Sequence, residues 1–87
     1  MDSLPKVIVD MGAIRFVCNG ADVMAPGIAE MGEFGVGDIV VIRDVTYGKA
    51  LAIGMANKSN VEIEMSKKGK VIKNLHYVGD KLWSEVS

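Results

Sequence analysis

The sequence predicts a mainly β fold, a small closed or nearly closed barrel with two short helices, for three reasons. Several runs of β-branched and other apolar residues have the length of strands and end at glycine, proline or other turn residues. Two separate segments carry helix-capping signals. The chain has only 87 residues, and closing the sheet protects strand edges that so small a domain could hardly cover otherwise.

The chain is expected to open with a strand and a helix. Residues 5–10, PKVIVD, place β-branched residues after a proline, as is typical of a strand. Asp10 can cap the helix that we expect over residues 12–19, because its carboxylate can accept a backbone N–H of the first turn. The apolar face of this helix should consist of Ala13, Ile14, Phe16 and Val17, with Arg15 and Asn19 available to solvent. Gly20 stands where this helix should end, since glycine adopts the left-handed conformation without a Cβ clash.

The middle of the chain predicts one irregular and one regular strand. Residues 22–28, DVMAPGI, should form an irregular strand in which Pro26 marks an edge, a bulge or a turn, because proline cannot donate to a ladder. Residues 29–38 are rich in turn signals. Residues 39–45, IVVIRDV, predict a strong strand that is buried on both sides over its first four residues.

The second half predicts a hairpin, a second helix and two final strands. Gly48 can take positive φ in a tight turn that leads to a returning strand over residues 50–56. Ser59 and Glu62 form an S-x-x-E capping box, and the helix that it opens should end near residues 67–69. Strands over residues 70–78 and 81–86 follow, joined by a turn at residues 79–80.

Composition limits the classes of function. One histidine, one cysteine and no paired metal-ligand spacing offer little for catalysis, so we expect no catalytic residue, no metal and no cofactor. No apolar run approaches the roughly 18 residues that span a bilayer, and no secretory signal opens the chain, so we expect no membrane partner. The single Cys18 suits a reducing compartment, and we expect a cytoplasmic protein.

Charge is close to balanced but unevenly distributed. The net charge of −1 argues against a general polyanion binder. Residues 58–87 nevertheless carry six lysines against four acids. Such a cluster is most often a solvated face, and the lysines near residue 67 also suit the negative end of the second helix.

Four segments together resemble a PUA domain, the module named for pseudouridine synthases and archaeosine transglycosylases. They are DMGAIRFVCNGADVMAPGI, GVGDIVVI, KALAIGMA and GKVIKNLHYVGDKLW, and they occur in the family's order from about Lys6 to Glu85. The first and last are most similar to the PUA domain of the malignant T-cell amplified sequence family and its archaeal relatives. That resemblance implies a six-stranded pseudobarrel with two short helices. Proteins of this group usually carry an additional N-terminal domain, for which this chain has no room, so we expect a single PUA domain over residues 1–87.

The resemblance also implies RNA binding, on the small ribosomal subunit, in non-standard initiation, reinitiation or recycling. The loop after the first helix, the following strand and parts of the later strands commonly contact RNA in the family. Here they correspond to residues 19–27 and to portions of the segment from Lys70 onward. Small residues there would let phosphates or bases approach main-chain N–H groups. Arg15 is a phosphate or stacking candidate, and Lys49 and Lys73 are secondary electrostatic candidates. The full candidate set is Arg15, Asn19, Gly20, Ala21, Asp22, Met24, Ala25, Pro26, Gly27, Lys49 and Lys73.

Other residues that invite functional readings are expected to be structural. His76 has no metal-binding partners in the sequence and is expected to bond to backbone inside the fold. Cys18 is expected to be a small buried residue, and Tyr77 and Trp83 to be core aromatics.

The expected function is therefore that of a non-catalytic RNA-binding domain whose partners are rRNA or tRNA, the small ribosomal subunit and translation factors. Two alternatives stay open. The domain could position RNA for an RNA-modifying enzyme, or it could be a protein-interaction module of a ribosome-associated protein. An exposed apolar patch around Met24 without adjacent basic surface would favour the last.

Overall fold

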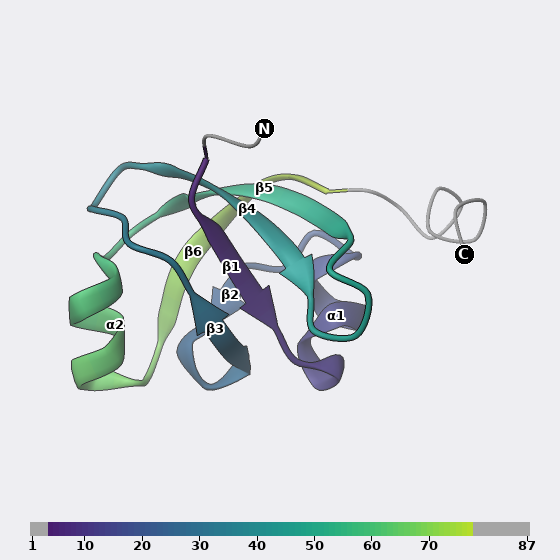
Figure 1. Cartoon of the computed structure of the whole chain (residues 1–87), viewed down its shortest axis with the longest axis horizontal. Helices are drawn as coiled ribbons and strands as arrows, with labels where there is room; N and C mark the ends of the chain where they lie inside the picture. Colours follow the sequence, from purple (N-terminus) through teal and green to yellow (C-terminus); the bar gives the residue numbers. More distant parts are fainter. Residues whose placement is uncertain (1–3, 78–87) are drawn as a thin grey trace.

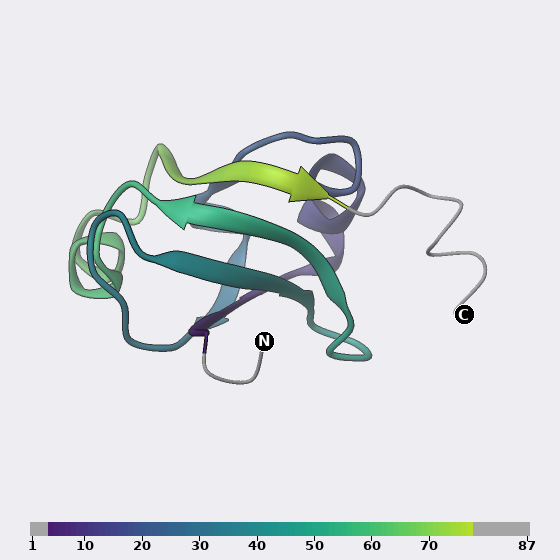
Figure 2. The same cartoon turned by 90° about the horizontal axis from the view of Figure 1, so that it is seen from above.

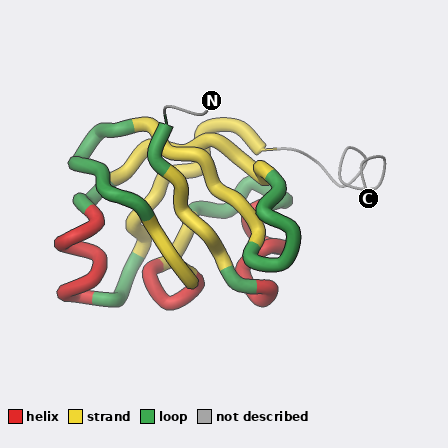
Figure 3. The backbone as a smooth tube through the Cα atoms, in the orientation of Figure 1, coloured by secondary structure: helices red, strands yellow, loops and turns green. Residues whose placement is uncertain are grey.

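Six strands and two short helices make up the part of the chain that the structure, a computed structural model, describes, which is residues 4–77. Figure 1 shows the two helices at opposite ends of the sheet, and Figure 3 shows the same path by secondary structure. The strands are β1 (Lys6–Val9), β2 (Val23–Met24), β3 (Ile28–Met31), β4 (Ile39–Asp44), β5 (Ala50–Ala56) and β6 (Lys70–Tyr77). The helices are α1 (Met11–Val17) and α2 (Asn60–Ser66), with a 3-10 turn, η1 (Ala25–Gly27), between β2 and β3.

The strands form one sheet in the order β2-β6-β5-β4-β1-β3. Strands β1 and β4 pair in parallel, and the other neighbours pair antiparallel. The antiparallel run of β4, β5 and β6 lies side by side in Figure 2. The β4–β5 pair is the hairpin that the sequence predicts, with Gly48 at φ +69° in its turn.

The sheet nearly closes into a barrel because its two edge strands are almost consecutive in sequence. Strands β2 and β3 lie at opposite edges of the sheet, and only the three residues of η1 separate them. The sheet must therefore curl until its edges meet. The Ala25 N–H donates to the Gly69 carbonyl at one side of this junction, and the Asp10 N–H donates to the Gly27 carbonyl at the other, both at 2.9 Å. The predicted fold class is confirmed.

The interior of the barrel is filled by small and medium apolar side chains. Strands β1, β4, β5 and β6 contribute two or three core residues each, β2 contributes Val23, and β3 contributes none. Cys18 is 3 % exposed and belongs to this core, as predicted. The remaining members are Val7, Val9, Val17, Val23, Ala25, Phe34, Val40, Ile42, Leu51, Ala52, Ala56, Ile63, Val71 and Ile72.

Both predicted helix caps are present. The Asp10 carboxylate accepts the Ala13 N–H at 3.0 Å, so α1 begins directly after it at Met11. Ser59 and Glu62 form the reciprocal capping box of α2. Helix α1 ends at Val17, earlier than predicted, and the chain then turns through Gly20, whose φ is +90°.

Three predictions need correction. The irregular strand over residues 22–28 is split by η1 into β2 and the start of β3, because Pro26 begins a turn. Strand β3 runs into the segment that was expected to be only turns; as an edge strand it needs few apolar residues, and it pairs Val7 with Met31. Ile39 is 36 % exposed, so burial of β4 starts one residue later. The strand predicted over residues 81–86 and its turn lie outside the described residues.

Candidate nucleic-acid interface

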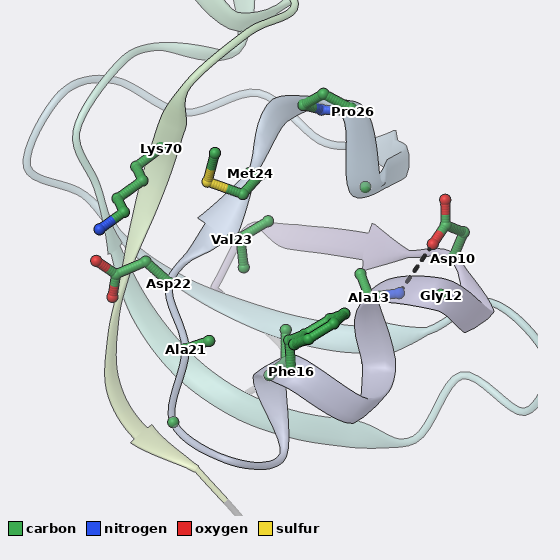
Figure 4. A pocket seen from close by; sticks show the side chains of 13 residues that line it. Asp10, Gly12, Ala13, Phe16, Ala21, Asp22, Val23, Met24, Pro26 and Lys70 are labelled. Atoms are coloured by element: carbon green, nitrogen blue, oxygen red, sulfur yellow. Dashed lines mark hydrogen bonds between the residues drawn. The ribbon is translucent and has the colours of Figure 1, made fainter.

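A cleft of about 730 Å³ lies between α1 and the segment that leads through β2 and η1. Figure 4 shows α1 forming one wall, with Met24 and Pro26 on the other. The segment from Gly20 to Gly27 was the leading RNA-contact candidate of the sequence, and most of it lines this cleft. The lining residues are Asp10, Gly12, Ala13, Phe16, Val17, Gly20, Ala21, Asp22, Val23, Met24, Pro26, Gly27 and Lys70.

The walls of the cleft are mainly apolar and expose two large side chains. Phe16 is 61 % exposed and Met24 is 45 % exposed. Gly27 lets the opposite wall come close to α1, since a Cβ at this position would lie 3.0 Å from the Ala13 Cβ. An exposed ring on one wall faces a thioether and a proline on the other, and apolar walls of this kind can hold an unstacked base between them.

The charged groups of the cleft lie at its ends. Asp22 and Lys70 stand at one end in Figure 4, and Asp10 stands at the other. Both carboxylates already accept a hydrogen bond from a backbone N–H group: Asp10 from Ala13 and Asp22 from Asn74, each at 3.0 Å. Lys70 is the one cation among the described residues that line the cleft. The cleft is thus better suited to a base than to a row of phosphates.

Strand β6 anchors the loop between α1 and β2. The Asn74 side-chain Nδ2 donates to the carbonyls of Val17 and Ala21, at 3.1 Å each. The ring of Tyr77 covers Gly20 closely, because a Cβ on Gly20 would lie 2.9 Å from the ring. These contacts join residues more than fifty positions apart and fix the floor of the cleft.

Backbone donors are less available than the sequence suggested. The N–H groups of Asn19 and Ala21 donate to Phe16 O, and that of Gly20 donates to Val17 O. Ala25 N is bonded to Gly69 O. Direct capture of phosphate by these four amides would need bonds of the fold to break. Side chains, rather than the main chain of the loop, are therefore the available contact groups.

Five of the candidate residues lie elsewhere. Ala25 is only 7 % exposed and packs into the core, so its side chain cannot contact a ligand, which corrects its inclusion. Arg15 and Asn19 line a separate hollow on the other side of α1, near Lys49. Lys73 is exposed on β6, where it pairs with Met55. The structure brings together the other six candidates, Gly20, Ala21, Asp22, Met24, Pro26 and Gly27.

Sequence reasoning missed Phe16, did not single out Lys70 within the segment that begins at this residue, and misplaced two residues of β6. Phe16 was assigned to the apolar face of the first helix, and the structure exposes it to the cleft. His76 is exposed on β6 rather than inside the fold. Tyr77 is 45 % exposed and covers Gly20 instead of joining the core. Trp83 lies outside the described residues.

Metal-binding groups and membrane-spanning helices also bear on the class of site. Within residues 4–77, no group of three or more histidine, cysteine or acidic side chains is arranged to hold a metal ion. No helix of the described chain is long and apolar enough to cross a membrane.

Comparison with known proteins finds relatives in translation and in RNA-containing assemblies. The chain is 48 % identical to an uncharacterised protein of Methanocaldococcus jannaschii, over 97 % of this chain and 54 % of the relative. It is 39 % identical to translation machinery-associated protein 20 of Saccharomyces cerevisiae, over 95 % of this chain and 50 % of that protein. It is 40 % identical to malignant T-cell-amplified sequence 1 of Rattus norvegicus, over 92 % of this chain and 46 % of that protein. The chain spans about half the length of these relatives.

Solved structures agree with these relatives. A hypothetical protein of Pyrococcus horikoshii superposes with a TM-score of 0.81 at 41 % identity, over 94 % of this chain and 50 % of that one. A chain in the structure of an H/ACA ribonucleoprotein bound to a substrate RNA superposes with a TM-score of 0.80 at 31 % identity, over 85 % of this chain and 23 % of that one. The family model described as the PUA domain matches residues 5–78. The chain belongs to the PUA domain family.

Proposed function

We propose that this PUA domain is a non-catalytic RNA-binding domain that acts on rRNA or tRNA in translation, and that its cleft receives an unpaired base. The observation that carries the proposal is the cleft itself, where the exposed Phe16 ring and Met24 face the space between α1 and β2. RNA is commonly recognised through bases that have left the helix and stack on aromatic or apolar side chains.

Similarity to translation machinery-associated protein 20 supports the translation setting. We infer a cytoplasmic role in initiation, reinitiation or recycling on the small ribosomal subunit, with ribosomal RNA or a tRNA end as the ligand. We expect the isolated domain to bind RNA weakly, because the cleft has one lysine and the whole chain has a net charge of −1. Tight binding would then need a second module on the same protein or complex.

A second candidate function is to position RNA for an RNA-modifying enzyme. It is favoured by the likeness to a chain of the H/ACA ribonucleoprotein that is bound to a substrate RNA. Both functions use the same cleft, so they differ in the RNA that binds best. A protein-interaction module is disfavoured, because Lys70 stands beside the apolar patch around Met24.

The test is an NMR titration of the ¹⁵N-labelled chain with tRNA and with small-subunit rRNA fragments at two salt concentrations. We expect amides of residues 12–27 and of Lys70 to shift. Phe16→Ala should weaken binding by about 5- to 150-fold, since base–aromatic stacking contributes about 1–3 kcal/mol. Met24→Ala should weaken it by less, because a thioether contact contributes less than a ring.

Met65→Ala is the matched control, because Met65 is 81 % exposed on α2, away from the cleft. It should leave RNA affinity unchanged. If no RNA perturbs the cleft amides, or if Met24→Ala and Met65→Ala behave alike, the proposed site is wrong. A stronger response to modification-guide or substrate RNA than to tRNA or rRNA would favour the second candidate.

A further inference from the structure

A second hollow lies on the other side of α1 from the cleft. Its volume is about 510 Å³, and it is lined by residues of α1 and of the turn between β4 and β5. The two recesses share α1 as their dividing wall: Gly12, Ala13 and Phe16 face the cleft, whereas Met11, Arg15 and Cys18 face the hollow. This division follows from the helix period, since residues three and four apart share a face.

The hollow differs from the cleft in its charge. Arg15 lines the hollow and is exposed. Tyr47 lines it from the turn, and the Nζ of the nearby Lys49 lies 5.6 Å from the centroid of the Tyr47 ring. Tyr47 is 72 % exposed. Two cations beside an exposed aromatic ring are the groups with which proteins bind single-stranded nucleic acid, through phosphates and base stacking respectively.

The one acidic residue that lines the hollow, Asp44, accepts hydrogen bonds from the β4–β5 turn. Asp44 is 1 % exposed and accepts the N–H groups of Thr46, Tyr47 and Lys49 at 2.7 to 3.0 Å. These bonds use the backbone of the turn and not the ring of Tyr47, which is exposed, while Lys49 is half-buried beside it. Arg43 adds a bond from Nη1 to Gly48 O at 2.8 Å. Tyr47 and Lys49 are therefore presented by a rigid turn, which lowers the entropic cost of binding.

We propose that this hollow is a second RNA contact, in which Arg15 and Lys49 hold phosphates of a single strand and Tyr47 stacks one base. The proposal rests on the proposed function of the cleft and divides the work between the two recesses. A strand that crosses α1 places an unpaired base beside Phe16 in the cleft and its flanking phosphates beside Arg15. The cleft then supplies apolar contact, and the hollow supplies the salt-dependent part of the affinity.

The experiment measures how the affinity for a fluorescent single-stranded RNA oligonucleotide depends on salt, by fluorescence anisotropy with the full 87-residue chain. Each phosphate contact on a single strand contributes about 0.7 to the slope of log affinity against log salt. The double variant Arg15→Ala/Lys49→Ala should lose about 1.4 of this slope. Between 50 and 200 mM salt the wild-type affinity should therefore fall about sevenfold more than that of the double variant.

Tyr47→Ala should weaken binding about tenfold without changing the slope, and Tyr47→Phe should restore most of the affinity. Lys68→Ala, which removes an exposed lysine just after α2, is the control for charge alone and should keep the wild-type slope. Thermal melts of each variant show that it is folded, and we expect little change because the turn is held through the backbone of Tyr47 and Lys49.

The outcomes separate the two proposals. A double variant with wild-type slope, or with the same small change as Lys68→Ala, overturns the second contact while the cleft proposal stands. Both proposals are supported if Phe16→Ala weakens binding without changing the slope of log affinity against log salt, and if Arg15→Ala/Lys49→Ala reduces that slope. A wild-type chain that binds no RNA overturns both.

Discussion

Asn74 is the residue whose replacement most directly tests how the cleft is held open. Its Nδ2 donates to the carbonyls of Val17 and Ala21, at 3.1 Å each, and so ties the end of α1 and the following loop to β6. Asn74→Ala removes both bonds but keeps the backbone bond from Asn74 N to the Asp22 carboxylate. The loss is thus confined to the side-chain amide.

The size of the effect follows from the partners that remain. A net contribution of about 1 kcal/mol per hydrogen bond gives an upper value of about 2 kcal/mol. Val17 O keeps the bond from Gly20 N, and the Ala21 contact is solvent-exposed, so water can replace part of the loss. We expect a decrease of about 1–2 kcal/mol in the free energy of unfolding. For a domain of this size that lowers the Tm by roughly 4–16 °C.

Asn74→Asp sharpens the test because it keeps the shape of the side chain. The carboxylate oxygen that takes the place of Nδ2 would then face the carbonyls of Val17 and Ala21, and the new negative charge would lie near the Asp22 carboxylate. Acceptors that face acceptors are worse than a missing side chain, so Asp should destabilise more than Ala.

The assay is urea denaturation followed by circular dichroism, with Lys73→Ala, an exposed neighbour on β6, as the control. The expected order of stability is wild type and Lys73→Ala, then Asn74→Ala, then Asn74→Asp. RNA affinity should fall in the same order. An Asn74→Asp variant as stable as wild type would refute the anchoring role.

Three other substitutions test the fold at defined points by thermal denaturation. Asp44→Ala should cost about 3 kcal/mol or more, because three backbone N–H groups of the β4–β5 turn lose their acceptor, and a Tm within 5 °C of wild type would contradict this. Gly54→Ala should prevent stable folding or lower the Tm strongly, since its Cβ would lie 2.6 Å from the Ile72 Cγ2 and 2.7 Å from the Lys73 carbonyl. Ser59→Ala should cost about 1 kcal/mol through loss of the α2 cap, and no measurable change would show that the cap is dispensable.

Local signals predicted much of the fold because they act within a few residues. A carboxylate three residues before an N–H, or a hydroxyl three residues before a glutamate, produces the same cap in almost any context, and both caps are present at Asp10 and Ser59. Gly20 and Gly48 likewise take the positive φ that their positions indicated. The edge strand β3 was missed because it is only four residues long, lies between Gly27 and Gly32, and has no fully buried residue to mark it.

The cleft could be predicted as a segment but not as a surface. Residues 19–27 were selected largely for their small side chains, and the structure confirms the turn at Gly20. It also brings Gly27 close to Ala13, a contact that the sequence did not predict. Whether their N–H groups point to solvent depends on partners such as Phe16 O and Gly69 O. Those partners are set by the tertiary fold, and no local pattern reports them.

The faces of α1 show why side chains were harder to assign than segments. An amphipathic helix normally buries its apolar stripe, so Phe16 was expected to pack inward and Arg15 to face the RNA. Here α1 packs on the barrel through Val17 and Cys18, and its remaining surface divides between two recesses. Successive helical residues point about 100° apart, so the neighbours Arg15 and Phe16 line different recesses of one short helix. A ligand that uses both must cross α1, and a single strand of nucleic acid has the flexibility to do so.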